Sequence, residues 1–354
     1  MTRKIGLDVV RATAISLVLL SHFVKKLDFL GIYGVEMFFS LSGFLIGGIL
    51  YRSLTTAPSW SFNEVKVFWQ RRWWRTLPNY YFFFLLWIPF HYFFGGLPDL
   101  SGLLSTFVFS QNLLSVSSGF FGVAWSLCIE EWFYLLFPSL LLLFTFLRFS
   151  KRAAFIAATA LFLIIPPILR EFSFLHNKPE IVRMMTLPRL DALFYGVAMA
   201  FIMARHRLSN PVKVMLLTLS VIGVGSLFVF WQHGEISQNM VPFYRAAFFV
   251  LPVCFALILP FFASVKTLPS PLSVLSRPIT NLSLWSYSIY LSHIPILFVT
   301  YAAFGPSRDS AAINSLSKIV GLAVCLVCSK LIFTYLETPL MHRRPVERSA
   351  ANAS

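Results

Sequence analysis

Long apolar stretches recur from one end of the chain to the other, and they restrict the fold more than any other feature. A helix needs about 20 predominantly apolar residues to cross a bilayer. Continuous runs such as FYLLFPSLLLLFTFL do not suit a membrane β-barrel, whose strands alternate outward-facing and inward-facing residues. We therefore predict an all-α fold, a polytopic integral membrane protein with about ten transmembrane helices. The expected spans are residues 6–25, 34–52, 77–95, 123–147, 153–170, 189–205, 212–231, 245–264, 283–304 and 314–336.

The composition leaves no room for a sizeable soluble domain. Charged residues make up 12% of the chain, whereas about 25% is usual in soluble domains, and the mean hydropathy is +0.75. The formal net charge of +15 is spread over the short connections, which argues against a nucleic-acid partner. The four cysteines lie inside apolar runs, which favours packing over metal binding. We expect one transmembrane domain over residues 1–344 and a polar, disordered tail over 345–354.

The distribution of Lys and Arg between the connections predicts the orientation in the membrane. The connection 96–122 carries neither residue type, whereas the connection 52–76 carries Arg52, Lys66, Arg71, Arg72 and Arg75. Basic residues accumulate in cytoplasmic connections. Placing 52–76 inside gives an excess of basic residues on that side of about two to one, and it makes both termini cytoplasmic.

The first predicted span, DVVRATAISLVLLSHF, carries three polar residues that a membrane span rarely contains. Arg11 and His22 are eleven residues apart, which is about three helical turns and roughly 16 Å of rise on nearly the same face. Asp8 lies three residues before Arg11 and joins that face. Ionisable groups within a membrane usually face the protein interior and mark a functional site. In the alternative, Asp8 and Arg11 cap the span at the headgroups and His22 anchors its other end.

The second span, YGVEMFFSLSGFLIGGIL, combines small residues with one acid. Its glycines, Gly34, Gly43, Gly47 and Gly48, allow helix backbones to approach closely. Glu36 lies near the end of this span that adjoins His22. A carboxylate at this position either orients the imidazole and fixes its tautomer, or is a solvated glutamate at the end of the span.

Basic and aromatic residues alternate in WQRRWWRTLPNYY, just before the third span. Arg72 and Arg75 are three residues apart and share a helix face, and Arg71 adjoins them. Such a cluster can bind phosphates through bidentate, charge-assisted hydrogen bonds, with the tryptophans at the interface or stacked on a base. The same residues also fit a cytoplasmic anchor with an aromatic belt.

The segment WSLCIEEWFYLLFP opens the fourth span with a polar stripe. Ser126, Glu130 and Tyr134 recur every four residues and therefore share one face, whereas Glu131 is turned about 100° away. We expect Glu130 to face the site. Weaker candidates stand in later spans, and their roles stay open: Arg189, Asp191, His293 and Glu337.

The order of these motifs resembles the membrane acyltransferase-3 family of O-acyltransferases. The matching segments are LDVVRATAISLVLLSHF with its Arg-x10-His spacing, GVEMFFSLSGFLI, FWQRRWWRTLP, WSLCIEEWFYLLFP, SYSIYLSH and YLETP. They extend over almost the whole chain in family order. Each segment alone is weak evidence for the family, whereas the whole set in this order is specific for it. Some relatives carry an added extracytoplasmic esterase-like domain, which we do not expect in this chain.

The resemblance implies transfer of an acyl group across the bacterial inner membrane. Cytoplasmic acyl-CoA, with acetyl-CoA expected, is the implied donor, and no metal is implied. The implied acceptor is a hydroxyl of an extracytoplasmic carbohydrate or lipid-linked glycan. It could belong to O-antigen, to exopolysaccharide or to a small glycosylated product. The protein is expected to contact membrane lipids. The family's first-span residues fall on Arg11 and His22, its fourth-span acid falls on Glu130, and its arginine cluster falls on Arg71, Arg72 and Arg75.

These residues suggest a division of roles. His22 is the expected general base, because an imidazole with a pKa of about 6.5 can take the proton of an attacking hydroxyl. Glu130 or Glu36 orients it or binds the sugar, and Arg11 stabilises the developing oxyanion or binds the donor. Alternatively, His22 receives the acyl group covalently before passing it on. The competing function is a transporter or flippase for an anionic glycan or lipid that uses the same residues.

Overall fold

The computed structural model describes residues 4–96, 99–116, 119–237, 240–304 and 311–345. Within these ranges the secondary structure is helical, which confirms the predicted all-α class. The predicted tail lies outside the described residues except for Pro345. The long helices are α1 (Ile5–Phe23), α2 (Leu30–Thr56), α3 (Phe62–Gly95), α5 (Ala124–Phe146), α6 (Lys151–Phe174), α8 (Asp191–Arg205), α9 (Asn210–Ser237), α10 (Val241–Phe262), α11 (Ser276–Phe304) and α12 (Ala311–Ile332).

Each of the ten predicted spans coincides with one of these long helices, to within a few residues at most ends. In the described part of the chain, nine helical segments are long and apolar enough to cross a membrane. The predicted span 77–95 is helical but is not one of the nine. Its prolines, tyrosines, Asn79 and His91 lower its mean hydropathy, although leucine and phenylalanine fill most of the remaining positions.

Short helices lie in connections where the sequence analysis placed no secondary structure. They are α4 (Leu100–Phe107), α7 (Pro179–Met184) and α13 (Thr338–Met341). The π-helical turn Phe333–Glu337 lies at the end of the predicted span 314–336. Asp99 caps α4 by accepting a hydrogen bond from the Gly102 amide at 3.1 Å. Such short helices lack the long hydrophobic period that reveals a membrane span, and α7 contributes to the site described below.

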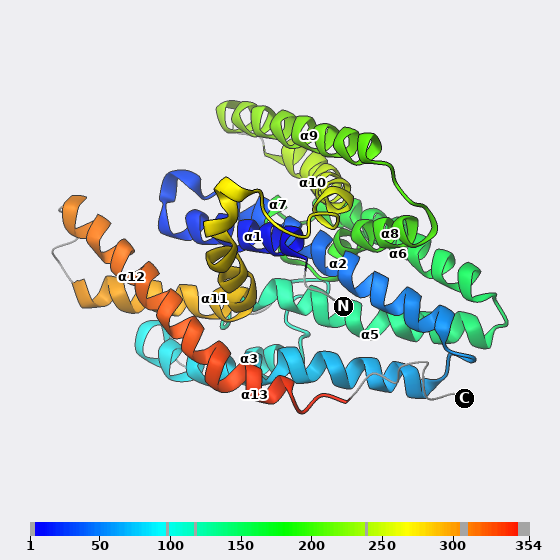
Figure 1. The fold of residues 1–354 in the computed structure, drawn as a ribbon. Helices are drawn as coiled ribbons and strands as arrows, with labels where there is room; N and C mark the ends of the chain where they lie inside the picture. Colours follow the sequence, from blue (N-terminus) through cyan, green and yellow to red (C-terminus); the bar gives the residue numbers. More distant parts are fainter. Residues whose placement is uncertain (1–3, 97–98, 117–118, 238–239, 305–310, 346–354) are drawn as a thin grey trace.

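Helix α2 lies at the centre of the molecule. It packs against α1, α8 and α10, and α9 lies on the periphery against α10 (Figure 1). Helix α11 packs between α1 and α12, while α3 and α5 run side by side on the side of α2 that faces away from α9 (Figure 1). The helices that carry the predicted site residues, α1, α2, α3 and α5, therefore surround one region of the interior.

The contact between α2 and α8 depends on glycine. A Cβ atom at Gly43 would lie 1.8 Å from the Leu193 carbonyl oxygen, and one at Gly196 would lie 2.0 Å from the Ser40 carbonyl oxygen. Neither helix could approach as closely with a larger residue, since both obstructing atoms belong to the backbone. The prediction that small residues of the second span allow close helix packing is confirmed at this contact.

Candidate functional site

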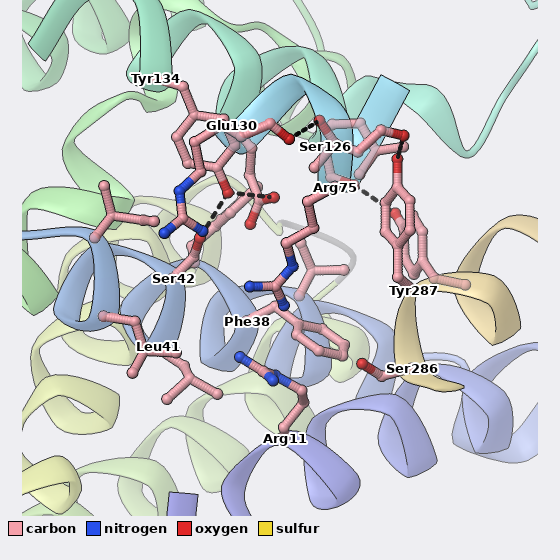
Figure 2. A pocket seen from close by; sticks show the side chains of 18 residues that line it. Arg11, Phe38, Leu41, Ser42, Arg75, Ser126, Glu130, Tyr134, Ser286 and Tyr287 are labelled. Carbon is pink, nitrogen blue, oxygen red and sulfur yellow. Dashed lines mark hydrogen bonds between the residues drawn. The ribbon is translucent and has the colours of Figure 1, made fainter. Parts of the chain in front are cut away.

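A cavity with about 880 Å³ of empty space, part of it open to solvent, lies between α1, α2, α3, α5 and α11. Four of the predicted site residues line it (Figure 2): Arg11, Arg72, Arg75 and Glu130. The sequence distance from the first of these residues to the last exceeds one hundred positions, so only the packing of the spans brings them together.

Three guanidinium groups reach this cavity from two helices. Arg11 comes from α1, and Arg72 and Arg75 come from α3, and Figure 2 shows Arg11 and Arg75 facing each other across the space. Arg72 precedes the predicted span 77–95. Burial is the main cause that lowers the pKa of its guanidinium to about 10, and the positive charges of Arg75 and Arg71 act in the same direction. The group is still a cation at neutral pH, so the cavity wall is strongly positive.

Arg71 points elsewhere. Its Nη1 donates a hydrogen bond of 2.7 Å to the carbonyl oxygen of Pro345, near the end of the described chain. The residues that line the cavity include its two neighbours Arg72 and Arg75 but not Arg71. The structure therefore divides the predicted arginine cluster between the cavity and a contact with the C-terminal segment.

The polar stripe of α5 faces the cavity as expected. Ser126, Glu130 and Tyr134 all line it. The Tyr134 hydroxyl donates to Glu130 Oε2 at 3.1 Å and lies 3.1 Å from the Ser42 hydroxyl of α2 (Figure 2). Glu131 is turned away and accepts a hydrogen bond of 2.8 Å from Thr76. Among the described residues that line the cavity, Glu130 is the one carboxylate, beside three arginines.

Asp8 is buried within the protein. Its Oδ1 accepts a hydrogen bond of 2.7 Å from Ser283 of α11, and the residue is 6% exposed. Arg11, one turn further along α1, lines the cavity. Asp8 and Arg11 therefore both face the interior of the helix bundle.

His22 ends α1 next to a second histidine rather than inside the cavity. Its ring centroid is 5.0 Å from that of His293 on α11. His293 lies in turn 5.7 Å from the ring of Tyr290, whose hydroxyl is 2.6 Å from Ser126 Oγ. Tyr290 and Ser126 both line the cavity. A series of contacts from Ser126 through Tyr290 and His293 therefore links the cavity to His22.

The tautomer of His293 follows from its contacts. Its Nδ1 lies 2.7 Å from the Tyr290 carbonyl oxygen, which can only accept, so Nδ1 carries the proton and donates. Nε2 is then a hydrogen-bond acceptor. It is buried and has no hydrogen-bond partner among the described residues.

Glu36 forms an ion pair that the sequence analysis did not foresee. Its Oε1 accepts a hydrogen bond from Arg189, and both side chains are buried. The described contacts include no hydrogen bond between Glu36 and His22. Nearby, Arg170 donates to both oxygens of Asp191 at 2.8 and 2.9 Å. The weaker candidates Arg189 and Asp191 thus join two buried ion pairs that fix the start of α8.

Three further residues near the site were not singled out from the sequence. Ser42 and Tyr290 lie in the quoted motifs GVEMFFSLSGFLI and SYSIYLSH, so those motifs contained a signal for them. Arg183 lies in α7, outside every quoted motif, and its guanidinium is 5.3 Å from the ring centroid of Trp125. The remaining candidate, Glu337, is buried and accepts hydrogen bonds from Ser288 at 3.0 Å and Asn79 at 3.3 Å.

Comparisons with known proteins agree with these observations. The chain is 27% identical to the peptidoglycan O-acetyltransferase OatA of Listeria monocytogenes over 95% of its own length and 55% of that protein. It is 26% identical to the O-acetyltransferase OatA of Staphylococcus aureus over 95% of its own length and 57% of that protein. The chain thus spans about half the length of the curated relatives it matches. No solved structure matches it.

The family model of the acyltransferase-3 group, described as an acyltransferase domain, matches residues 4–335. This range contains every described residue that lines the cavity, together with His22 and His293. The chain therefore belongs to the acyltransferase-3 family.

Proposed function

We propose that this protein transfers an acyl group, acetyl by preference, from cytoplasmic acyl-CoA to a hydroxyl of a carbohydrate outside the inner membrane. The observation that carries the proposal is the arginine-rich cavity, which side-chain contacts through Tyr290 and His293 link to His22. The names of the relatives support acetyl as the group and a cell-wall glycan as the class of acceptor.

The donor's phosphates would bind at the arginines. Arg72 and Arg75 lie at the end of α3 that the positive-inside pattern assigns to the cytoplasm. A planar guanidinium group can donate two parallel hydrogen bonds to the oxygens of one phosphate. The negative phosphates would also offset the repulsion between the arginines of the cavity. Arg11 lines the same cavity, which favours donor binding over the oxyanion role that the sequence also allowed.

The thioester would then lie near the histidines. His22 and Arg11 are separated by roughly 16 Å along α1, a distance that the long pantetheine arm of the donor can bridge. The acceptor oxygen attacks the thioester carbonyl carbon as His22 takes its proton. The carbon–sulfur bond breaks, and the coenzyme A thiolate leaves and receives that proton. Glu130 would either bind the polar arm of the donor or hold the neighbouring side chains in place. It would do the latter through Tyr134, which hydrogen-bonds both Glu130 and Ser42.

Glu36 would act through Arg189 rather than on the imidazole directly. The buried pair holds α2 against the segment that begins α8, and so keeps the wall beside His22 in place. Removal of one partner would leave an uncompensated buried charge.

The proposal is tested on the surface glycans of cells with and without this protein. Proton spectra are recorded before and after mild base treatment. We expect a base-labile acetyl signal that requires the protein and disappears when His22→Ala replaces it at equal abundance. An unchanged acetyl signal in cells without the protein would rule out the proposed function. Mass spectrometry of the protein incubated with acetyl-CoA alone distinguishes direct attack from an acyl-His22 intermediate.

A further inference from the structure

Arg183 occupies the same end of the bundle as His22. Helix α7 joins the end of α6 to the segment that begins α8, while His22 ends α1 and Trp125 begins α5. Because α5 and α6 are consecutive and pack against each other, the end of α6 and the start of α5 lie on one side. The guanidinium of Arg183 stacks over Trp125, whose neighbour Ser126 lines the cavity.

The other arginines that the structure describes at this end are paired with carboxylates. Arg189 pairs with Glu36 and Arg170 with Asp191, and Arg245 lies 3.1 Å from Glu171 on the exposed surface.

Arg183 differs from these arginines. No carboxylate forms an ion pair with it in the described part of the chain, and its Nε, like that of Arg189, is buried without a hydrogen bond to a described residue. Glu180, three residues earlier in α7, is exposed, and no ion pair joins the two in the described part of the chain. Burial lowers the pKa of Arg183, which reflects the cost of keeping this cation away from water. A cation that has both an unpartnered buried donor and no paired carboxylate indicates a place for an anion.

The neighbours of Arg183 point to a sugar. Its charge acts on the imidazole of His22 and on the carboxylate of Glu36, so it lies within electrostatic reach of both. Trp125 is partly exposed and offers an aromatic surface of the kind that packs against sugar rings. One surplus positive charge is balanced by one carboxylate, whereas a phosphate monoester would bring nearly two negative charges.

We propose that Arg183 and Trp125 form an acceptor subsite beside His22 that binds the carboxylate of an acidic sugar. This inference rests on the proposed function, because it gives the acceptor a chemical class: a glycan with a carboxylate on or next to the residue that receives the acyl group. The arginine binds the carboxylate while the tryptophan packs against the ring, and the hydroxyl is thereby held at His22.

The test compares two probes that share the same sugar chain and differ at the carboxyl groups, which are charged in one and methyl-esterified in the other. Tetragalacturonate carries four carboxylates, and its fully methyl-esterified form keeps every ring hydroxyl and loses the charges. Binding of each to the purified full chain in lipid nanodiscs is measured by titration calorimetry without donor. We expect the acid to bind about tenfold more tightly than the ester, the effect of one charge-assisted hydrogen-bonded contact.

Variants assign this preference to Arg183. Arg183→Gln should bind acid and ester equally, while Arg183→Lys keeps part of the preference. Arg245→Gln, which removes an exposed arginine at the same end, should behave like the wild type. Equal binding of both probes by the wild type, no binding of either, or an unchanged preference in Arg183→Gln would each overturn the inference. Thermal melting of each variant shows whether it is folded.

Failure of this inference is distinguishable from failure of the proposed function. Binding is measured without acyl transfer, so a protein that acetylates glycans but shows no charge preference loses only the acidic-sugar subsite. If Arg183→Gln instead slows transfer to charged and uncharged acceptors equally and leaves binding unchanged, Arg183 acts on the transition state and the subsite is wrong.

Discussion

The position of one proton on His293 limits what the pair of histidines can do. Because Nδ1 donates to the Tyr290 carbonyl, Nε2 can only accept; it is buried without a described partner, in a ring whose centroid lies 5.0 Å from that of His22. An acceptor beside a catalytic imidazole can fix its orientation and tautomer. His293 is therefore a candidate positioning residue for His22.

Variants of His293 test this role. Gln at this position can present an oxygen where Nε2 stands, whereas Leu fills the space without an acceptor. We expect His293→Leu to slow acyl transfer about tenfold to a hundredfold and His293→Gln to recover part of that loss. The rate of thiol release from acetyl-CoA by membranes that contain acceptor glycan measures both. Equal activity of the two variants would contradict a positioning role.

The largest single effect is expected at His22. Removal of a general base typically slows a reaction by about 10² to 10⁴. We expect His22→Ala to lose acyl transfer to this extent and to keep the melting temperature of the wild type, since the side chain is exposed at the end of α1. Full activity of a folded His22→Ala protein would end the proposal.

Arg72 and Arg75 should act on the donor. Replacing either with Gln removes one charge-assisted contact to phosphate, so we expect the KM for acetyl-CoA to rise about tenfold with a smaller change in kcat. Lys66→Gln is the matched control, because this basic residue lies on the same helix and is exposed. An unchanged KM for acetyl-CoA in Arg72→Gln and Arg75→Gln would contradict their assignment to donor binding.

At the scale of elements, the helical period predicts which residues share a face of one helix, but it does not predict which side chains meet between helices. The stripe of Ser126, Glu130 and Tyr134 could be derived because the 3.6-residue repeat places residues four apart on one face. The partner of Glu36 could not, because Arg189 is 153 positions away and meets it only through the packing of α2 on α8. Arg183 was missed since α7 has six residues and no hydrophobic period.

The contact of α2 with α8 gives a prediction about stability. Gly43→Ala would place a methyl group against the Leu193 backbone, and we expect a loss of about 1–3 kcal/mol in unfolding free energy. Gly48→Ala is the control in the same helix, because its nearest neighbour would lie 3.6 Å from the new carbon, an ordinary contact. Melting in detergent compares the two, and equal melting temperatures would show that the helices can separate without cost.

At the scale of the whole molecule, the predicted orientation places the arginine-rich end of α3 in the cytoplasm and His22 toward the outside. Ser59 lies in the connection between α2 and α3, Ser115 lies in the connection between α4 and α5, and both are exposed. A membrane-impermeant maleimide added to intact cells should label Ser115→Cys and should label Ser59→Cys only after permeabilisation. The wild type shows how much label the four native cysteines take up. The reverse labelling pattern would show that the orientation in the membrane is opposite to the predicted one.

The hydroxyl pair of Ser126 and Tyr290 has a bioenergetic consequence. At 2.6 Å these two hydroxyls leave no room for a water molecule between them, and they stand where the cavity meets the histidines. A continuous column of water there would let protons and other ions leak through the protein. In the proposed orientation, this contact would close the route to water while no donor is bound, and the donor's arm must separate the two hydroxyls to reach His22.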